Sequence, residues 1–223
     1  MALSGIQIYK LLPQTNCKEC GFPTCLAFAM KLAAKQVELA DCPYVSDEAK
    51  AQLESAAAPP VRLITVQSDE EHAVKVGNET VMFRHEKTFV NKPGLFGRVR
   101  DDEDLGEVAK RVAAADAYQV DYVGVDLELD GFVVQSEAGT PEAFSAAVSA
   151  VRENTKKPLI LISTSPDVMA AGLQVLDGEK PLIYAANADN WEAMVELAKT
   201  YKAPLAVVAS DLEVLSELST QVK

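Results

Sequence analysis

The amino-acid sequence predicts an α/β protein with two domains, a small and mainly helical domain followed by a parallel (β/α) domain. All four cysteines lie within the first 42 residues, which sets that part of the chain apart. The segment ESAAAPP at 54–60 ends in two prolines, which cannot extend a helix and therefore suit a linker. Beyond it, short apolar runs alternate with helix-like segments. We therefore expect domains at 1–58 and 59–223.

The distribution of charge supports this division. Residues 1–58 carry 5 basic and 6 acidic side chains, whereas the remainder of the chain carries 16 and 27. The net charge of −12 argues against binding to nucleic acid, because the phosphates would be repelled. No segment has the pattern of a secretory signal or a membrane span, so we expect a cytoplasmic protein that does not contact a membrane.

The first domain is expected to contain short helices around a cysteine-rich loop. The loop, NCKECGFPTC at 16–25, includes Thr24, a residue suited to capping the helix that follows. The helices are expected at 4–12, 25–35 and 46–53.

The second domain reads as strands that are apolar throughout and are separated by helices, which is typical of a parallel sheet covered by helices. Strands are expected at 61–66, 80–84, 120–129, 158–163, 181–186 and 203–209, and helices at 102–117, 141–154, 166–176, 190–202 and 212–220.

Five or six strands leave two architectures open. A closed eight-stranded barrel typically takes about 250 residues, and 163 residues follow the linker. The domain is therefore either an open, doubly wound sheet or part of a (β/α) barrel.

The cysteines follow the spacing Cys17-x2-Cys20-x4-Cys25-x16-Cys42. Disulfides need an oxidising compartment, which nothing in the sequence indicates. Zinc sites usually combine two close CxxC pairs, whereas a tight triplet with one distant cysteine favours an iron–sulfur cluster held by four thiolates. The cluster is the preferred hypothesis, with zinc and free thiols as alternatives.

Chain geometry allows Cys42 to reach the other three cysteines. The eleven-residue helix expected after Cys25 travels about 16 Å, and residues 36–41 can return about 20 Å if extended. Gly21 permits a tight turn, and the N–H groups at the start of the helix favour a thiolate at Cys25. We therefore predict that all four cysteines ligate one cluster.

Two segments resemble a known family. Residues 15–46, TNCKECGFPTCLAFAMKLAAKQVELADCPYVS, are similar to the N-terminal [4Fe–4S] domain of the large (gamma) subunit of the corrinoid iron–sulfur protein of the acetyl-CoA (Wood–Ljungdahl) pathway. Residues 83–101, FRHEKTFVNKPGLFGRVRD, resemble the start of that subunit's barrel. The resemblance implies a cluster domain followed by a (β/α) TIM-barrel-type domain that is incomplete in this chain.

The resemblance also implies a function. In that family, a corrinoid cobalt accepts a methyl group from methyltetrahydrofolate with the help of a methyltransferase, and delivers it to the acetyl-CoA synthase of the carbon monoxide dehydrogenase complex. One electron from the cluster returns inactive Co(II) to Co(I). The large subunit forms a heterodimer with a smaller barrel subunit. The chain is thus expected to be a methyl carrier in anaerobic carbon fixation, with catalysis shared with its partner enzymes and no catalytic residue assigned.

The sequence departs from this family pattern by ending at Lys223, which leaves no room for a corrinoid-binding domain after residue 209. We expect that the corrinoid (cobalamin) is not bound by these residues alone. Two other functions stay open: a general iron–sulfur electron-transfer module fused to an unrelated α/β domain, and a zinc-stapled interaction protein. The segment FRHEKTFVNKPGLFGR favours the methyl carrier over the general module.

Some charged residues lie outside the cysteine motif. The segment 84–100 is basic apart from Glu86 and is expected to follow a strand, where it could dock a partner or a phosphate-bearing cofactor tail. A solvated loop is the simpler interpretation. Within this segment, His85 is expected to be buried or hydrogen-bonded, and His72 is expected at the surface.

Three carboxylates alternate with leucines near the end of an expected strand, at Asp126, Glu128 and Asp130. Such a group could perform acid–base chemistry or bind a cation, but more often it caps the following loop. Trp191, near the start of an expected helix, is interpreted as a packing residue.

Overall fold

The protein is described by a computed structural model, which covers residues 4–33, 36–46, 48–50, 52–53, 61–79, 85 and 89–222. It divides into two compact units, Met1–Arg62 with Asn78–Val90, and Leu63–Gly77 with Asn91–Lys223.

Two sequence-based expectations fall outside the described residues. These are the linker at 54–60 and the strand at 80–84. The domain boundary between residues 58 and 59 therefore stays a prediction. No helix within the described ranges is long and apolar enough to cross a lipid bilayer.

The first unit is built from short helices. Helix α1 spans Gly5–Leu11, α2 spans Cys25–Ala33, and the 3₁₀ helix η1 spans Leu39–Asp41. Ser4 caps α1 through a reciprocal pair of bonds with Gln7, the arrangement called a capping box. Residues 48–50 and 52–53 are also helical, so each of the three expected helices is found, within a few residues of its expected ends.

These helices enclose a small apolar core. Phe28 of α2 is almost fully buried, and its ring lies 5.7 Å from that of Phe22. Gly5 of α1 faces Met30 of α2 at a distance that leaves no room for a Cβ atom, so the glycine lets the two helices pack closely. The core also contains two of the four cysteines, Cys25 and Cys42.

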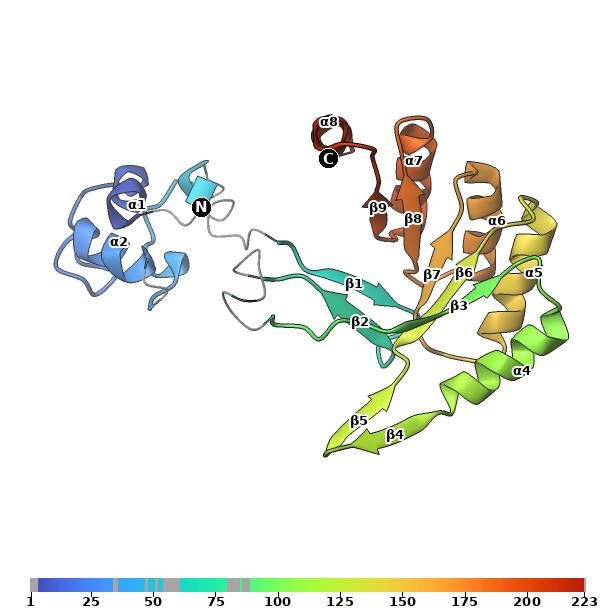
Figure 1. Cartoon of the computed structure of the whole chain (residues 1–223). Helices are drawn as coiled ribbons and strands as arrows, with labels where there is room; N and C mark the ends of the chain where they lie inside the picture. Colours follow the sequence, from blue (N-terminus) through green and yellow to red (C-terminus); the bar gives the residue numbers. More distant parts are fainter. Residues whose placement is uncertain are drawn as a thin grey trace. The chain divides into compact units, whose positions relative to one another are not determined.

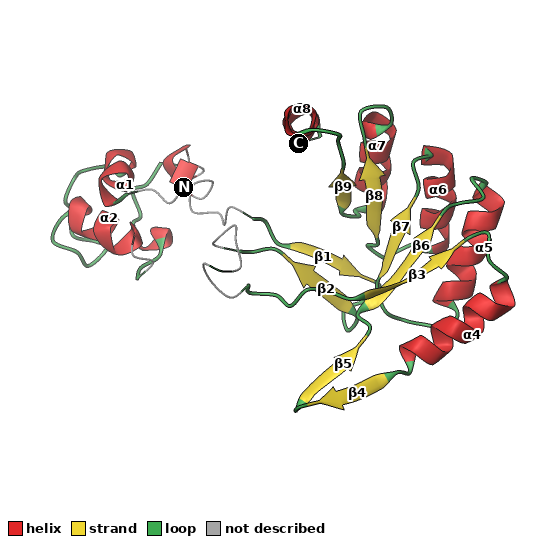
Figure 2. Cartoon of the chain, in the orientation of Figure 1, coloured by secondary structure: helices red, strands yellow, loops and turns green. Residues whose placement is uncertain are grey.

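The second unit contains a five-stranded parallel sheet (Figure 2). Its strands, in spatial order, are β3 (Phe96–Arg100), β6 (Gly131–Gln135), β7 (Leu159–Ile162), β8 (Leu182–Ala186) and β9 (Leu205–Val207).

Helices connect these strands and lie along one face of the sheet (Figure 1). The neighbours α4–α5, α5–α6 and α6–α7 pack against each other in that order. The helices are α4 (Leu105–Asp116), α5 (Pro141–Arg152), α6 (Pro166–Val175) and α7 (Trp191–Tyr201), with α8 (Leu212–Gln221) after the last strand.

The strand order decides between the two expected architectures. A doubly wound sheet reverses its strand order at a switch point and carries helices on both faces. Here the spatial order follows the chain order throughout, as in a segment of a (β/α) barrel. The predicted α/β fold class is therefore confirmed.

The core lies between the sheet and its helices. Alternate strand residues such as Val99, Val134 and Leu161 point into it and are fully buried. Burying one such side chain contributes about 1.5–3 kcal/mol. Gly172 of α6 lies against the ring of Phe144 of α5, where an added Cβ would come within 2.5 Å of a ring carbon, so these helices pack at unusually close range.

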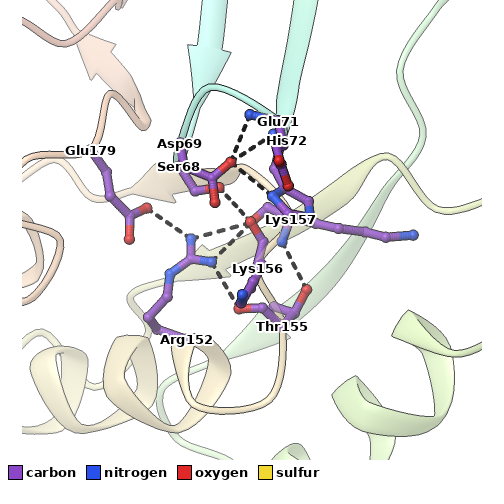
Figure 3. A network of polar contacts seen from close by, with 9 residues as sticks. All are labelled: Ser68, Asp69, Glu71, His72, Arg152, Thr155, Lys156, Lys157 and Glu179. Carbon is purple, nitrogen blue, oxygen red and sulfur yellow. Dashed lines mark hydrogen bonds and ion pairs between the residues drawn. The ribbon is translucent and has the colours of Figure 1, made fainter.

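A short antiparallel hairpin contacts the amino-terminal end of this sheet. It consists of β1 (Ile64–Gln67) and β2 (Ala73–Val76). Gln67 forms a bridge with Lys180, just before β8, and the hydroxyl of Ser68 donates to the carbonyl of Lys156, just before β7. Figure 3 shows the contact between Ser68 and Lys156 beside the side chain of Arg152. The hairpin is thus fixed to the sheet by polar bonds.

The single strand expected at 120–129 is wrong. This segment forms a second hairpin, β4 (Gln119–Tyr122) and β5 (Val125–Glu128), joined by Val123 and Gly124. Both joining residues have positive φ, 54° and 76°, so the chain reverses direction within two residues. The next strand of the sheet is β6, which the sequence analysis did not identify.

Candidate metal centre

The cysteine-rich loop joins α1 to α2 and has an unusual backbone. Three of its non-glycine residues, Gln14, Asn16 and Lys18, have φ of 57°, 50° and 66°. Gly21 follows with φ of 80°. Because a left-handed conformation costs roughly 1–2 kcal/mol for a residue with a side chain, the surrounding contacts must hold this loop in place.

Asn16 provides two of those contacts. Its side-chain oxygen accepts a hydrogen bond from the backbone N–H of Cys25 at 2.8 Å, and its own N–H donates to Sγ of Cys25 at 3.4 Å. At the next turn, the hydroxyl of Thr24 accepts from the N–H of Ala27 at 3.1 Å, as predicted for a capping residue. Cys25 is therefore fixed at the first position of α2.

Cys42 follows η1 and is buried in the same apolar cluster as Cys25. Burial raises the pKa of the Cys42 thiol, whereas the backbone N–H of Tyr44 acts in the opposite direction. The charges of the other three cysteines raise this pKa further, because neighbouring thiolates repel. Cys20 packs against the same cluster, so Cys42 lies in the same small core as two cysteines of the triplet. Ligation of one cluster by all four cysteines stays a prediction.

A hydrogen bond between two side chains joins the two cysteine-bearing segments. The hydroxyl of Tyr44 donates to the carboxylate of Glu19 at 2.8 Å, and this bond raises the pKa of Tyr44. Glu19 lies between Cys17 and Cys20, and Tyr44 lies two residues after Cys42. The contact joins residues that are 25 positions apart, and the sequence analysis identified neither of them.

The four thiols differ in exposure. Cys17 is exposed and Cys20 is half-buried, whereas Cys25 and Cys42 are buried. A group held between them would be shielded by the apolar core on one side and accessible at the Cys17 side. Such a site can exchange electrons with a docked partner without opening the fold.

Four cysteines are a donor set that can hold either a single zinc ion or an iron–sulfur cluster. Thiolates on one zinc ion each lie about 2.3 Å from the metal and are therefore close to one another. An iron–sulfur cluster can also take four thiolates as its ligands. The feature that favours the cluster is the sequence spacing, in which a tight triplet is followed by the distant Cys42.

The basic segment does not lie where the sequence analysis expected it. Its last five residues form strand β3, rather than a loop at the carboxyl end of a strand. Arg98 and Arg100 alternate with the buried Val99 and are exposed, and Arg100 pairs with Asp102 at 3.0 Å. His85 is exposed, so the expected burial is wrong, whereas the hydrogen-bonded alternative stays a prediction.

The three carboxylates do not form a site. Asp126 and Glu128 lie on β5, where Glu128 pairs with Lys157 at 2.9 Å. Asp130 instead accepts the N–H of Leu95 at 2.8 Å and pairs with Lys92 at the same distance. Asp130 therefore positions backbone, as the simpler interpretation expected, but the backbone of Leu95 rather than that of the following loop.

The two remaining residues behave as expected. The ring of His72 bonds to Asp69 at 2.8 Å within the turn of the first hairpin, and the side chain is partly exposed. Trp191 packs against the core of the second unit.

Comparisons with known proteins agree with both units. Residues 64–223 match the family model described as "CO dehydrogenase/acetyl-CoA synthase delta subunit", and residues 12–44 match one described as "Putative Fe-S cluster". The chain is 42% identical over 218 residues to the corrinoid/iron-sulfur protein large subunit of Moorella thermoacetica, covering 98% of this chain and 49% of that protein.

Archaeal relatives show the same relationship. The chain is 42% identical over 222 residues to subunit gamma 2 of the acetyl-CoA decarbonylase/synthase complex of Methanosarcina mazei, covering 97% of this chain and 47% of the relative. It is 36% identical over 224 residues to the gamma subunit from Methanothermobacter thermautotrophicus, covering 100% and 48%. The chain thus spans about half the length of these curated relatives.

Proposed function

Because this chain belongs to the CO dehydrogenase/acetyl-CoA synthase delta subunit family, we propose that it is the iron–sulfur-bearing part of a methyl-carrying corrinoid protein. In this proposal the first unit holds one [4Fe–4S] cluster on Cys17, Cys20, Cys25 and Cys42. The names of its relatives, which include a corrinoid/iron-sulfur protein and subunits of an acetyl-CoA decarbonylase/synthase complex, support this assignment.

The observation that carries the proposal is the convergence of the four cysteines. Cys25 and Cys42 are buried in one apolar cluster and Cys20 packs against it, although Cys42 is 17 residues beyond Cys25 in the sequence. The charges of Cys17, Cys20 and Cys25 act to raise the pKa of the Cys42 thiol. The Tyr44–Glu19 hydrogen bond joins the same two segments independently of the sulfurs. A structural zinc ion is the alternative that the sequence leaves open, and it is less well supported because zinc sites usually combine two close CxxC pairs.

When bound, the cluster would supply one electron at a time, which is the change needed to return a Co(II) corrinoid to Co(I). The protein residues set the conditions for this. The N–H groups of Asn16 and Tyr44 point at Sγ of Cys25 and Cys42, and donors to cluster sulfurs are a recognised means of adjusting the reduction potential. Because Cys25 and Cys42 are buried, solvent would reach the cluster only from the side of Cys17.

The remaining parts of the activity rest on the rest of the assembly. We propose that the corrinoid is bound with residues outside this chain, that a methyltransferase supplies the methyl group from methyltetrahydrofolate, and that an acetyl-CoA synthase accepts it. A smaller subunit completes the carrier. A general electron-transfer module shares the cluster but not the cobalt, so cobalt reduction separates the two functions.

The test is reduction of a corrinoid by the purified protein. The chain is prepared anaerobically, reduced with Ti(III) citrate, freed of excess reductant and mixed with Co(II) cobalamin. We expect loss of the Co(II) EPR signal with about one cobalt reduced per chain, and no such loss with Cys20→Ser. Ala40→Ser, which adds a hydroxyl at an exposed position two residues before Cys42, is the control and should behave as the wild type. A reduced cluster that leaves Co(II) unchanged would favour the general module.

A further inference from the structure

The β4–β5 hairpin is a two-stranded ribbon that extends away from the parallel sheet (Figure 1). Its strands pair only with each other, and all eight strand residues are exposed. An isolated two-stranded ribbon is marginally stable in water unless one face is covered. The hairpin is therefore a surface element whose stability is not explained by the contacts that it makes within the described structure.

The ribbon is strongly amphipathic. Val120 pairs with Leu127 and Tyr122 pairs with Val125, so these four side chains share one face. That face is apolar and open to solvent, with Tyr122 69% exposed. Contiguous apolar surface of this kind on a folded protein marks a contact with another molecule.

The turn extends the apolar face to the tip of the ribbon. Val123 is 87% exposed and adopts φ of 54°, a conformation that is strained for a β-branched residue. Asn-Gly or Asp-Gly would suit this turn with less strain. The sequence instead keeps an apolar side chain at the most exposed point, which is explained if that side chain is buried by a partner.

The opposite face of the ribbon is acidic. Asp121 and Asp126 are directly opposite each other, and the described residues provide no cation that pairs with either carboxylate. Like charges at opposed positions destabilise a two-stranded ribbon. A cationic group supplied from outside would remove this repulsion.

Only the base of the ribbon is fixed to the rest of the unit. Lys157, in the loop before β7, pairs with Glu128 at 2.9 Å and donates to the carbonyl of Leu129 at 2.7 Å. The ribbon lies between α4 and β6, so its base is at the amino-terminal end of the sheet. Active sites of barrel-type domains are at the other end of the strands, so a partner held here would leave that end accessible.

We propose that the β4–β5 ribbon inserts into an apolar groove, bordered by lysine or arginine, on a different polypeptide of the assembly in which the chain works. This inference rests on the proposed function for the existence of that assembly. The charge of the ribbon argues against a second copy as occupant, because the chain carries a net charge of −12, with 33 acidic against 21 basic side chains. The area argues against a dimer of this chain held by the ribbon alone, since a stable interface buries about 800 Å² on each partner, more than one face of a ten-residue ribbon provides.

The test is a zero-length cross-link on the native assembly. The tagged chain is purified anaerobically from the organism that makes it, together with the polypeptides bound to it, and treated with a carbodiimide, which joins carboxylates to lysines in contact. We expect peptides that link Asp121 or Asp126 to a lysine of another polypeptide. Asp121→Asn with Asp126→Asn should abolish these links.

A binding measurement complements the cross-link. Tyr122→Ser with Val125→Ser should weaken association with that polypeptide by about tenfold or more, because central aromatic contacts dominate interfaces. Leu212→Ser, at an exposed apolar position on α8, is the matched control and should have no effect. Binding that is unchanged by the ribbon variant, links to a second copy of the chain, or isolation of the chain free of other polypeptides would each overturn the proposal.

The outcome is independent of the cluster. If iron is present and the ribbon variants bind normally, the ribbon proposal fails while the proposed function stands. If the links form but the chain holds no iron, the ribbon proposal stands while the proposed function fails.

Discussion

The guanidinium of Arg152 and the carboxylate of Glu179 form an ion pair at 2.9 Å with both side chains less than one-fifth exposed (Figure 3). Arg152 also donates to the backbone carbonyls of Thr155 and Lys157. Burial raises the pKa of Glu179 and lowers that of Arg152, even though pairing acts in the opposite sense on both. Taking these charges out of water therefore outweighs their mutual attraction.

This relationship predicts an asymmetry between the two partners. Arg152→Ala leaves a buried carboxylate and two carbonyls without donors, and should lower the free energy of unfolding by about 3–5 kcal/mol. Glu179→Gln leaves the guanidinium of Arg152 without its counter-ion but keeps the shape and a hydrogen-bond acceptor, and should cost less, about 1.5–3 kcal/mol. Urea denaturation measures both. Lys110→Ala, which breaks the exposed pair with Glu107, is the control with an expected change below about 0.5 kcal/mol; equal losses for the two buried variants would contradict this account.

Asp130 predicts a dependence of stability on acid pH. Burial acts to raise the pKa of this carboxyl, but the ion pair with Lys92, the N–H of Leu95 and the charge of Lys157 together lower it below the ordinary value. Its stabilisation is therefore present above the unfolded pKa of about 3.9 and is lost as the pH falls through the lower folded value.

Asp130→Asn should accordingly be less stable than the wild type by about 1–2 kcal/mol at pH 7. This difference should shrink as the pH falls below the unfolded pKa of about 3.9 and vanish once the pH is below the lowered folded pKa. Denaturation curves at a series of pH values give the measurement. A difference that persists undiminished at the lowest pH would show that the carboxylate charge is not the cause.

Asn16 predicts how the cysteine loop holds its conformation. Asn16→Gly keeps access to φ of 50° but removes the acceptor for the N–H of Cys25, whereas Asn16→Ala loses both. We expect faster loss of iron to an anaerobic chelator in the order wild type, glycine variant, alanine variant. Gln14→Gly changes a second left-handed residue that bonds to no cysteine, and should retain iron as the wild type does. Wild-type retention by Asn16→Gly would show that the hydrogen bond is not required.

Val123 predicts that the ribbon is not optimised for its own stability. Val123→Asn places a residue that tolerates φ of 54° before Gly124 and should stabilise the turn by about 1 kcal/mol. In the isolated chain, the ribbon amides should then exchange about fivefold more slowly. Val123→Thr keeps the β-branched shape and should leave exchange unchanged. Equal exchange in all three proteins would contradict the assignment of strain to this turn.

The sequence predicts those parts of the fold that depend on local signals. The helices beginning at Gly5, Leu105 and Pro141 start beside Ser4, Asp104 and Thr140, whose side chains accept the first free N–H groups. The ribbon escaped prediction because VDYVGVDLEL contains no Asn-Gly or Asp-Gly turn, so that its apolar run reads as one strand. Strand β3 was missed because an edge strand with one buried face carries arginines at alternate positions.

The cysteine site also has some features that the sequence predicts and others that it does not. Spacing and chain length indicated that Cys42 could return to the triplet, because the extended segment after the helix is long enough to span the length of that helix. The hydrogen bond between Tyr44 and Glu19 was not predictable, since it depends on how the segments pack once folded. The position of Asn16 before Cys17 was a usable signal, because Asn tolerates the left-handed conformation better than other residues.

The central claim is that one cluster joins all four cysteines, and the most direct measurement is iron, acid-labile sulfide and zinc in the anaerobically purified chain, with EPR after reduction. We predict about four irons and four sulfides per chain with a signal from a reduced [4Fe–4S] cluster, and loss of that stoichiometry in Cys42→Ser but not in Ala40→Ser. One zinc per chain without sulfide, or full iron content in Cys42→Ser, would contradict the claim.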